Sequence, residues 1–502
     1  MSTARKARKV LLVEFNEITW TVADRFLAEG KMPNLARLRA EGTTAAPEAL
    51  ERHPLLDPWV SWVTVHTGVD CLTHGAMVLE QDVTTIRAKR TWDYALEAGK
   101  SVGIWGSISA YPPRPVPGFM VPGPFAPGPE TYPAFLEPVQ ALNRKYTQVH
   151  HKNQEADTVL SMAKKGVELL RGGLSLETCS KIVQQLALEK VRPYMHWKRV
   201  TLQPYLNYDF FSDLYTKLRP DFATWHSNHA AHYQHHYWRA WDDTGFPARA
   251  TEEEKKKYGG AMEHGYRVVD DLLGRFMKLV DDDTVIVVAS ALGQKPYTHD
   301  LYPEGKICLK FKDVRQVLDL VGAKGVGDVV PVMDPQWNVR IADPTERARV
   351  RDALLAVRRE NAPTPDAITV DEVGEILTIT PRGLAKDDGA ARYFFPTENG
   401  TRELAVGDLF RIYGDTPKEG MHDTTGMLVM YGPGIERGLF LGHTTDLDVA
   451  PTLLALMGVP VPEIMQGRVL SEAWGERSKT NAGRAGERAE GGSSRSSSIA
   501  SA

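Results

Sequence analysis

The sequence predicts an α/β protein built on a doubly wound, mostly parallel sheet. Short, continuous apolar runs such as VLLVEF at 10–15 and TVIVVAS at 284–290 are typical of buried parallel strands. Helical patterns lie between such runs, for example at 261–280, where apolar residues recur every three or four positions. Strands that alternate with helices indicate crossover connections, and these connections produce a parallel sheet.

The remaining elements follow in chain order. Residues 19–42 predict two short helices that separate near Pro33 and end at Gly42. Proline and glycine are so dense between 111 and 133 that we exclude a helix or a central strand and expect a stiff surface excursion or a lid. Further strand-like runs lie at 101–106, 222–227 and 426–432.

The pattern divides the chain into a core with two insertions. Residues 134–221 are mainly helical and predict an insertion or cap, whereas residues 306–410 mix short strands and helices and predict a second insertion. From 476 to 502 the chain consists largely of Gly, Ser, Ala, Arg and Glu, so we expect a disordered tail. The predicted α/β core consists of 1–133, 222–305 and 411–475.

Composition narrows the classes of function. The 502 residues carry a net charge of −4, which gives no reason to expect nucleic acid as a partner. No apolar run approaches the roughly 20 residues that span a bilayer, and the first run is interrupted by Glu14, too early for a signal peptide. Cys71, Cys179 and Cys308 predict neither a disulfide framework nor a thiolate zinc site. We therefore expect a reduced, cytoplasmic protein without a membrane partner.

Candidate site residues follow from the direction of the strands. In parallel α/β sheets the chemistry lies beyond the carboxyl ends of the strands. The residues found there are Asn16, Asn228, Ala291 with Leu292, and His422 in the loop before 426.

Several segments then resemble a known family in the same order along the chain. They are VLLVEFNEITW with KMPNLARLRAEG, WVSWVTVHTGVDCLTHGAMV, YPPRPVPGFMVPG, TVIVVASALG, GMHDTTGMLVMYGPGIERG and DLDVAPTLLALMGVPVPEIMQGRVL. They are similar to type I phosphodiesterases and nucleotide pyrophosphatases of the alkaline phosphatase superfamily. The resemblance covers about 10–130, 220–300 and 420–470, and it implies an alkaline-phosphatase-like fold.

The resemblance also implies a site and a chemistry. In that family two divalent cations about 4 Å apart, held by three Asp and three His, polarise the ester. A hydroxyl bound to one metal is the nucleophile. By resemblance, Thr64 takes the position of this nucleophile and Asn16 that of the first metal-binding Asp. The other metal positions correspond to Asn228 and His232, to Ala291 and Leu292, and to His422.

These replacements predict a remodelled metal centre. A leucine side chain cannot bind a cation, and a neutral Asn carbonyl is a weak ligand without charge compensation. We therefore expect no binuclear centre and at most one zinc, manganese or iron ion. The predicted ligands are Asn228, His232 and His422, with His229 as a further ligand; His226, His235 and His236 in the same run are assigned to packing or to the helix surface.

Further side chains have predicted roles beside the substrate. Glu14 lies two residues before Asn16, on the same side of a strand, and could supply the carboxylate that position 16 lacks. Alternatively, it binds a backbone N–H or an arginine. Gln294 could donate a hydrogen bond to a substrate oxygen, or it satisfies its own loop.

The segment around Thr64 leaves two alternatives. If it is extended, His66 faces the same way and could deprotonate the Thr64 hydroxyl without a metal. If it is a helix, as the resemblance suggests, that pairing fails. Asp57 and Asp70 are expected to cap helices or form turns.

The predicted function is that of a hydrolase or transferase that acts on a phosphate or sulfate ester or diester of a small molecule. Thr64 or a water molecule would be the nucleophile. A catalytically silent relative that binds a phosphorylated ligand or a partner protein is the first alternative. A metal-independent transferase or lyase that relies on histidines is the second. The sequence does not specify the oligomeric state.

Overall fold

A computed structural model describes most of the chain. The predicted disordered tail at 476–502 lies outside the described residues. The described residues are 8–52, 55–77, 81–147, 173–298, 306–331, 336–360, 367–385, 391–397, 400–414 and 418–475.

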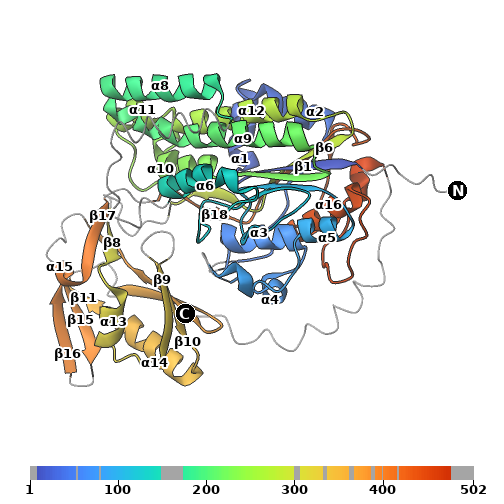
Figure 1. Cartoon of the computed structure of the whole chain (residues 1–502). Helices are drawn as coiled ribbons and strands as arrows, with labels where there is room; N and C mark the ends of the chain where they lie inside the picture. Colours follow the sequence, from blue (N-terminus) through green and yellow to red (C-terminus); the bar gives the residue numbers. More distant parts are fainter. Residues whose placement is uncertain are drawn as a thin grey trace.

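An eight-stranded sheet forms the centre of the main body (Figure 1). Its central strand, β1 (Lys9–Phe15), pairs in parallel with β5 (Phe222–Ser227) on one side and β6 (Thr284–Ser290) on the other. The predicted doubly wound, mostly parallel α/β sheet is confirmed. The strand order is β20-β2-β19-β6-β1-β5-β3-β4, with β2 (Thr43–Ala45), β3 (Val102–Trp105), β4 (Gly118–Val121), β19 (Met427–Tyr431) and β20 (Leu439–Phe440).

One strand of the predicted set runs in the opposite direction. β19 is antiparallel to β6 and β2, and its first residue, Met427, pairs with Ser290, the last residue of β6. The chain therefore enters β19 at the edge of the sheet where β6 leaves it. An apolar run predicts a buried strand equally well in either direction, so the sequence pattern could not reveal this reversal.

Helices cover both faces of the sheet (Figure 1). Alternate side chains of β1 divide between two cores, with Leu11, Val13 and Phe15 on one face and Val10 and Leu12 on the other. The first face carries α1 (Trp20–Ala28), α2 (Pro33–Glu41), α9 (Leu202–Leu218), α10 (His229–Trp241) and α12 (Ala261–Leu279); the second carries α3 (Pro58–Thr67), α4 (Cys71–His74), α5 (Thr91–Glu97) and α16 (Val449–Leu456).

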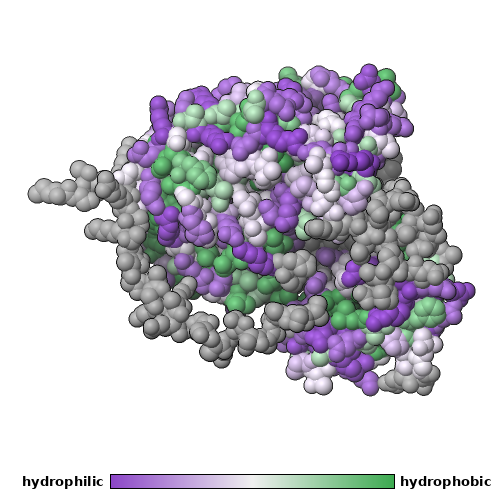
Figure 2. Space-filling view, turned by 180° about the vertical axis from the view of Figure 1, so that it is seen from behind, coloured by the Kyte–Doolittle hydropathy of each residue, from purple (hydrophilic) through white to green (hydrophobic). Residues whose placement is uncertain are grey.

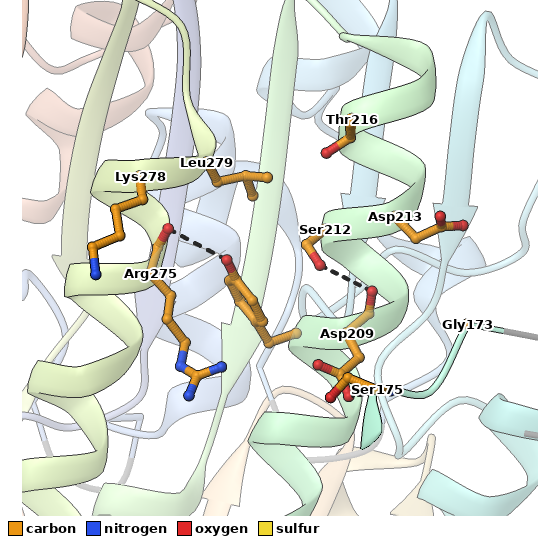
Figure 3. Close-up of a pocket in the computed structure, with 10 residues that line it drawn as sticks. Gly173, Ser175, Asp209, Ser212, Asp213, Thr216, Arg275, Lys278 and Leu279 are labelled. Atoms are coloured by element: carbon orange, nitrogen blue, oxygen red, sulfur yellow. Dashed lines mark hydrogen bonds between the residues drawn. The ribbon is translucent and has the colours of Figure 1, made fainter. Parts of the chain in front are cut away.

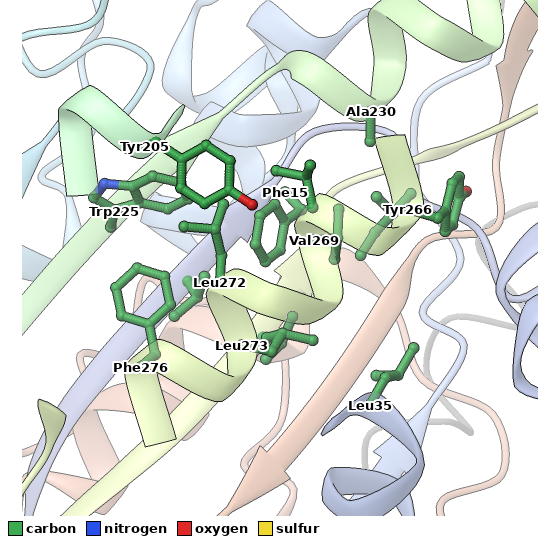
Figure 4. Packing of buried hydrophobic residues seen from close by; sticks show 14 of the residues in the cluster. Phe15, Leu35, Tyr205, Trp225, Ala230, Tyr266, Val269, Leu272, Leu273 and Phe276 are labelled. Carbon is green, nitrogen blue, oxygen red and sulfur yellow. The ribbon is translucent and has the colours of Figure 1, made fainter. Parts of the chain in front are cut away.

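Aromatic side chains fill the first core. Figure 4 shows Phe15 and Trp225 of the sheet beside Phe276, Leu272 and Val269 of α12. The ring centroids of Trp225 and Phe276 are 5.2 Å apart in an edge-to-face arrangement, which aromatic pairs favour. This packing fixes β1 and β5, and hence the residues that follow each strand.

The two helices predicted between 19 and 42 are confirmed as α1 and α2, and Gly42 ends α2. Within the Pro-rich segment 111–133 the chain forms β4, which is an edge strand of the sheet. An edge position is compatible with nearby prolines because only one side of the strand needs backbone donors. The segment also reaches α3, since Phe125 packs edge-to-face on Trp59 at 6.2 Å.

Two further parts are attached to this core. Described helices of 137–218 pack above the first face, and residues 306–414 form a separate lobe (Figure 1) with a hydrophobic core of its own. The helices are α6 (Glu137–Thr147), α8 (Leu176–Val191) and η3 (Pro193–Thr201), followed by α9, with α11 (Glu252–Tyr258) nearby. The lobe contains β8 (Lys306–Phe311), α13 (Val314–Leu320), β9 (Val326–Pro331), β10 (Trp337–Ile341), α14 (Pro344–Leu355), β11 (Arg358–Arg359), β12 (Ile368–Val373), β13 (Ile376–Pro381), β14 (Leu384–Ala385), β15 (Arg392–Thr397), β16 (Gly400–Ala405), α15 (Val406–Leu409) and β17 (Phe410–Gly414).

The lobe is inserted between two strands that pair with each other. β7 (Gly293–Pro296) and β18 (Gly420–Asp423) form an antiparallel pair beside the main sheet. The face in Figure 2 mixes hydrophilic side chains with smaller apolar areas. Among the described residues, no helix combines the length and the apolar character needed to cross a bilayer.

Candidate active site

The site lies beyond the carboxyl ends of β1, β5 and β6, where the strand directions predicted it. Asn16 follows β1 and Asn228 follows β5, and the Asn16 amide donates a hydrogen bond of 2.7 Å to Asn228 Oδ1. β7 follows β6 almost directly, and its Gln294 stands opposite His422 of β18 in the antiparallel register. The structure therefore brings together four of the predicted residues, which are Asn16, Asn228, Gln294 and His422.

Three potential ligands converge at the centre of this group. They are Glu17, His235 and His422, whose ligating atoms all lie within 4.8 Å of one another. Glu17 Oε2 is 3.1 Å from His235 Nε2 and 3.6 Å from His422 Nε2. Glu17 comes from the turn after β1, His235 from α10 and His422 from β18, so three separate elements build the centre.

Backbone carbonyls orient both imidazole rings. His235 Nδ1 is 2.9 Å from the Gly420 carbonyl oxygen, and His422 Nδ1 is 2.9 Å from that of Leu56. A carbonyl oxygen can only accept, so each Nδ1 carries the hydrogen. The opposite nitrogen of each ring, Nε2, therefore faces Glu17.

Amide side chains fix the Glu17 carboxylate. Asn16 donates to Oε1 at 2.7 Å and Gln294 donates to Oε2, while Gln234 donates to the Glu17 backbone oxygen at 2.7 Å. The residue sits in the left-handed region, at φ +59°, which costs energy for a side chain other than glycine. Burial raises the pKa of Glu17, but the neighbouring His422 and His235 outweigh this effect and lower it to about 2. Glu17 is therefore an ionised, rigidly held carboxylate.

Asn16 acts as a hydrogen-bond donor toward the site. The indole N–H of Trp62 donates to Asn16 Oδ1 at 2.8 Å, so the NH₂ group must face Glu17 and Asn228. The Asn16 oxygen points away from the position that a metal ligand would need. Asn16 thus holds the Glu17 carboxylate in place.

Asp57 lies at the N-terminus of α3, beside this centre. Its Oδ1 accepts the Trp59 N–H at 2.8 Å, which confirms the predicted capping role, and Asp70 caps α4 in the same way. Asp57 is half-buried, and burial raises its pKa, while His422 acts in the opposite direction. A raised pKa makes a carboxyl group a better acceptor of protons.

Thr64 is not part of this centre. α3 is a continuous helix, and Thr64 lies inside it with 0% of its surface exposed. Its hydroxyl donates to Glu51 Oε1 at 2.7 Å and lies 3.0 Å from His74 Nε2. The Ala76 N–H donates to His74 Nδ1, so His74 Nε2 carries the hydrogen and donates to Thr64. The Thr64 hydroxyl is thus enclosed in this buried network, and the structure does not bring it into the group of Glu17, His235 and His422.

A second buried network involves Glu14 and His66. Ser107 donates to Glu14 Oε1 at 2.8 Å, and Glu14 lies 3.3 Å from His66 Nε2 and 3.0 Å from His226 Nδ1. Glu14 is on the predicted side of β1, but its oxygens are taken up here, so it does not supply the missing ligand. The segment is helical, so the pairing of His66 with Thr64 fails, as expected for a helix, and His66 Nε2 lies near Glu14.

The structure assembles a different histidine set from the one predicted. His229 is buried between Ser227 Oγ, 2.8 Å from its Nδ1, and the Gly265 carbonyl, 3.3 Å from its Nε2, so both ring nitrogens are engaged. His232 packs on His236 with ring centroids 4.6 Å apart. The group contains His235, which we assigned to packing. The spacing in the sequence could have indicated His235, because Asn228 and His235 are seven residues apart and share one helix face.

Among the described residues, the donor set at this edge of the sheet has the ligand types for one cation. Ala291 and Leu292 are fully buried apolar side chains at the position of the missing Asp-His pair. The nearby Asn16 presents an NH₂ group, which a cation repels. One ion between Glu17, His235 and His422 would have two imidazoles and one carboxylate, a frequent donor set for catalytic metals.

A separate groove lies on the helical side of the main body (Figure 3), with a volume of about 470 Å³. Most of its charged groups have partners, since Arg275 binds Glu177 and Asp271, Asp213 binds Lys217, and Asp209 accepts the Ser175 N–H. None of the residues of the candidate active site lines this groove. The lining residues are Gly173, Ser175, Tyr208, Asp209, Ser212, Asp213, Thr216, Arg275, Lys278 and Leu279.

Comparison with known proteins places the chain in a family. Solved structures similar to it include human ectonucleotide pyrophosphatase/phosphodiesterase 5, at 12% identity and a TM-score of 0.44, with 91% of this chain and 96% of that chain covered. An inactive variant of the murine protein in complex with AMP covers the same shares at 11% identity and a TM-score of 0.44. No curated protein sequence matches significantly. The family model for type I phosphodiesterase / nucleotide pyrophosphatase matches residues 10–378. Because this match spans well over half of the sequence, the chain belongs to the type I phosphodiesterase / nucleotide pyrophosphatase family.

Proposed function

We propose that the protein is a phosphoester hydrolase that acts on a small molecule at a centre formed by Glu17, His235 and His422. The convergence of these three side chains at the strand ends of a family member is the observation that carries the proposal. A single divalent ion is the proposed cofactor, and it would supply Lewis acidity toward the phosphoryl oxygens.

The chain's own residues have distinct proposed roles. Asn16 and Gln294 hold the Glu17 carboxylate in place, and the carbonyls of Leu56 and Gly420 hold the two histidines. Water is the proposed nucleophile, because the Thr64 hydroxyl is enclosed between Glu51 and His74. Asp57, half-buried beside His422, is the proposed acceptor for the proton that leaves the attacking water.

A substrate panel tests this proposal. Nitrophenyl phosphate, bis-nitrophenyl phosphate and nitrophenyl sulfate should be assayed with the full chain in the presence of zinc, manganese or iron(II). We expect turnover of a phosphate ester or diester that falls at least about 100-fold in Glu17→Gln and His422→Ala, since each removes a group of the centre. His236→Ala is the matched control on α10. Turnover that persists in both centre variants would place the chemistry elsewhere.

A catalytically silent relative is the second candidate function. The apolar pair Ala291 and Leu292 favours it, because nothing at that position can assist a reaction. This candidate predicts no turnover of any ester in the panel, together with saturable binding of a phosphorylated compound. Turnover that survives complete removal of metal would instead support the histidine-based alternative.

A further inference from the structure

His235 and His422 both direct Nε2 at the same carboxylate oxygen, Oε2 of Glu17. His235 and His422 both use their Nδ1 hydrogen for a backbone carbonyl. In the neutral form each ring therefore directs the lone pair of Nε2 at Glu17. The carboxylate already accepts hydrogen bonds from Asn16 and Gln294, which favours its ionised form.

A lone pair that faces an anionic oxygen at 3.1 or 3.6 Å is repelled. A positive charge removes this conflict, and a cation bound between the three atoms, which lie within 4.8 Å of one another, supplies it to all three ligands at once. In a tetrahedral site with bonds of about 2.1 Å, neighbouring ligand atoms lie about 3.4 Å apart. The separations of Glu17 Oε2 from the two histidine nitrogens bracket this value, and all three ligand atoms lie within 4.8 Å of one another.

The surroundings limit the site to one ion of a particular class. Two imidazole nitrogens favour zinc, iron or manganese over magnesium and calcium, which prefer sets made only of oxygens. The hydrogen bonds that His235 and His422 donate to the carbonyls of Gly420 and Leu56 resemble the outer contacts that orient metal-bound histidines in other proteins. Trp62 keeps the Asn16 amide turned with its NH₂ group toward Glu17, so a second cation has no oxygen to bind there.

We propose that Glu17 Oε2, His235 Nε2 and His422 Nε2 form a mononuclear transition-metal site that has replaced the binuclear centre suggested by the family resemblance. The inference rests on the function proposed above, since it concerns the same centre. Three protein ligands leave coordination positions for water and a phosphoryl oxygen. His422 retains a position implied by the resemblance, whereas Glu17 and His235 are new ligands.

The test begins with stoichiometry. The full chain is freed of metal with a chelator and titrated calorimetrically with zinc and with manganese, and the bound metal is measured by elemental analysis. Cobalt(II) provides a spectroscopic signature, because its visible absorption reports on the geometry of the site. We expect one equivalent per chain; two equivalents, or none with any of these ions, would overturn the inference.

Variants then identify the ligands. Glu17→Gln and His235→Ala should each weaken metal binding at least about 100-fold and abolish the cobalt absorption, while thermal unfolding of the metal-free forms shows that both variants fold. His236→Ala is the matched control and should bind like the wild type. His232→Ala separates this set from the one that the sequence predicts. Loss of binding in His232→Ala with retention in His235→Ala would refute the proposed ligands.

The outcomes separate this inference from the proposed function. One tightly bound ion with the expected ligand dependence, but no turnover of any ester, supports the metal site and refutes the hydrolase. Turnover of an ester that requires His422 in a protein that binds no metal keeps the chemistry at this centre, refutes the metal site and supports the histidine-based alternative.

Discussion

Replacing Glu14 with glutamine tests the buried network beneath the active site. Glu14 is fully buried, and burial raises its pKa, but His66 and His226 outweigh this effect and lower it from 4.5 to about 2. A lowered pKa in the folded state means that the ionised form stabilises the fold. The contribution is complete above the unfolded pKa of about 4.5 and is lost as the pH falls toward 2.

The size of the effect follows from this shift. At about 1.4 kcal/mol for each pH unit, the ionised carboxylate contributes about 3 kcal/mol at pH 7 and less than half of that at pH 3. The loss of one partner from a buried charge pair is of the same order. Glu14→Gln keeps the shape and removes the charge, so we expect the variant to be about 3 kcal/mol less stable at pH 7.

The assay is urea unfolding followed by tryptophan fluorescence at pH 7 and pH 3. This signal reports mainly on the main body, because every tryptophan except Trp337 lies outside the lobe at 306–414. Glu97→Gln is the control, since it breaks an exposed pair with Lys89 that should contribute less than about 1 kcal/mol. A difference below about 1 kcal/mol at pH 7, or one that does not shrink at pH 3, would refute the reasoning.

Three further predictions concern the site and its supports. In Gly420→Ala the new Cβ would meet Gln294 Oε1 and would lie 2.6 Å from the Gln234 oxygen, so β18 must shift and carry His422 with it. We expect turnover to fall at least about 10-fold, whereas Gly407→Ala, where a Cβ meets nothing within 4 Å, should leave turnover unchanged. Asp57→Asn keeps the cap of α3, because asparagine also caps helices, and should lower turnover without lowering the melting temperature; equal loss of both would mean that Asp57 is only structural. Burial and the nearby Glu51 raise the pKa of Asp446 well above its usual value, so its contribution to stability is greatest at low pH and is lost as the pH rises through the raised pKa. Asp446→Asn should remove this loss, and the gap between the melting temperatures at pH 5 and pH 8.5 should narrow; a gap as wide as that of the wild type would contradict the assignment.

Much of the fold could be predicted because its signals are local. The runs that became β1, β5 and β6 are buried on both faces, and such strands are continuously apolar. The direction of β19 was not predictable, because strand direction depends on where the chain re-enters the sheet. The fold of residues 306–414 could not be predicted from the sequence either, because its strands are short and several of them, such as β16, are mostly exposed.

The site was predicted only as far as strand ends determine it. Asn16, Asn228 and His422 follow from that rule, and Gln294 lies just beyond the strand end at Ala291 and Leu292, but Glu17 and His235 do not follow from it. Glu17 lies in the turn after β1 and has a left-handed backbone conformation, which directs its side chain into the site. The pattern of apolar residues in the sequence contains no signal for such a turn. His235 lies among several histidines on one helix, and the choice between them depends on how α10 is rotated against β18.

The insertion of the lobe between β7 and β18 has a consequence in chain entropy. Pro296 and Gly420 are paired neighbours, so residues 297–419 form one long closed loop whose ends are already fixed by a strand pair. The cost of closing such a loop grows only logarithmically, by about 0.6 kcal/mol for each doubling of its length. The free energy of loop closure therefore depends little on the length of the segment between β7 and β18. A short turn and a whole domain would close this loop with similar free energies. The strands that carry Gln294 and His422 thus form an attachment point where additional structure could be gained or lost without unfolding the sheet beneath.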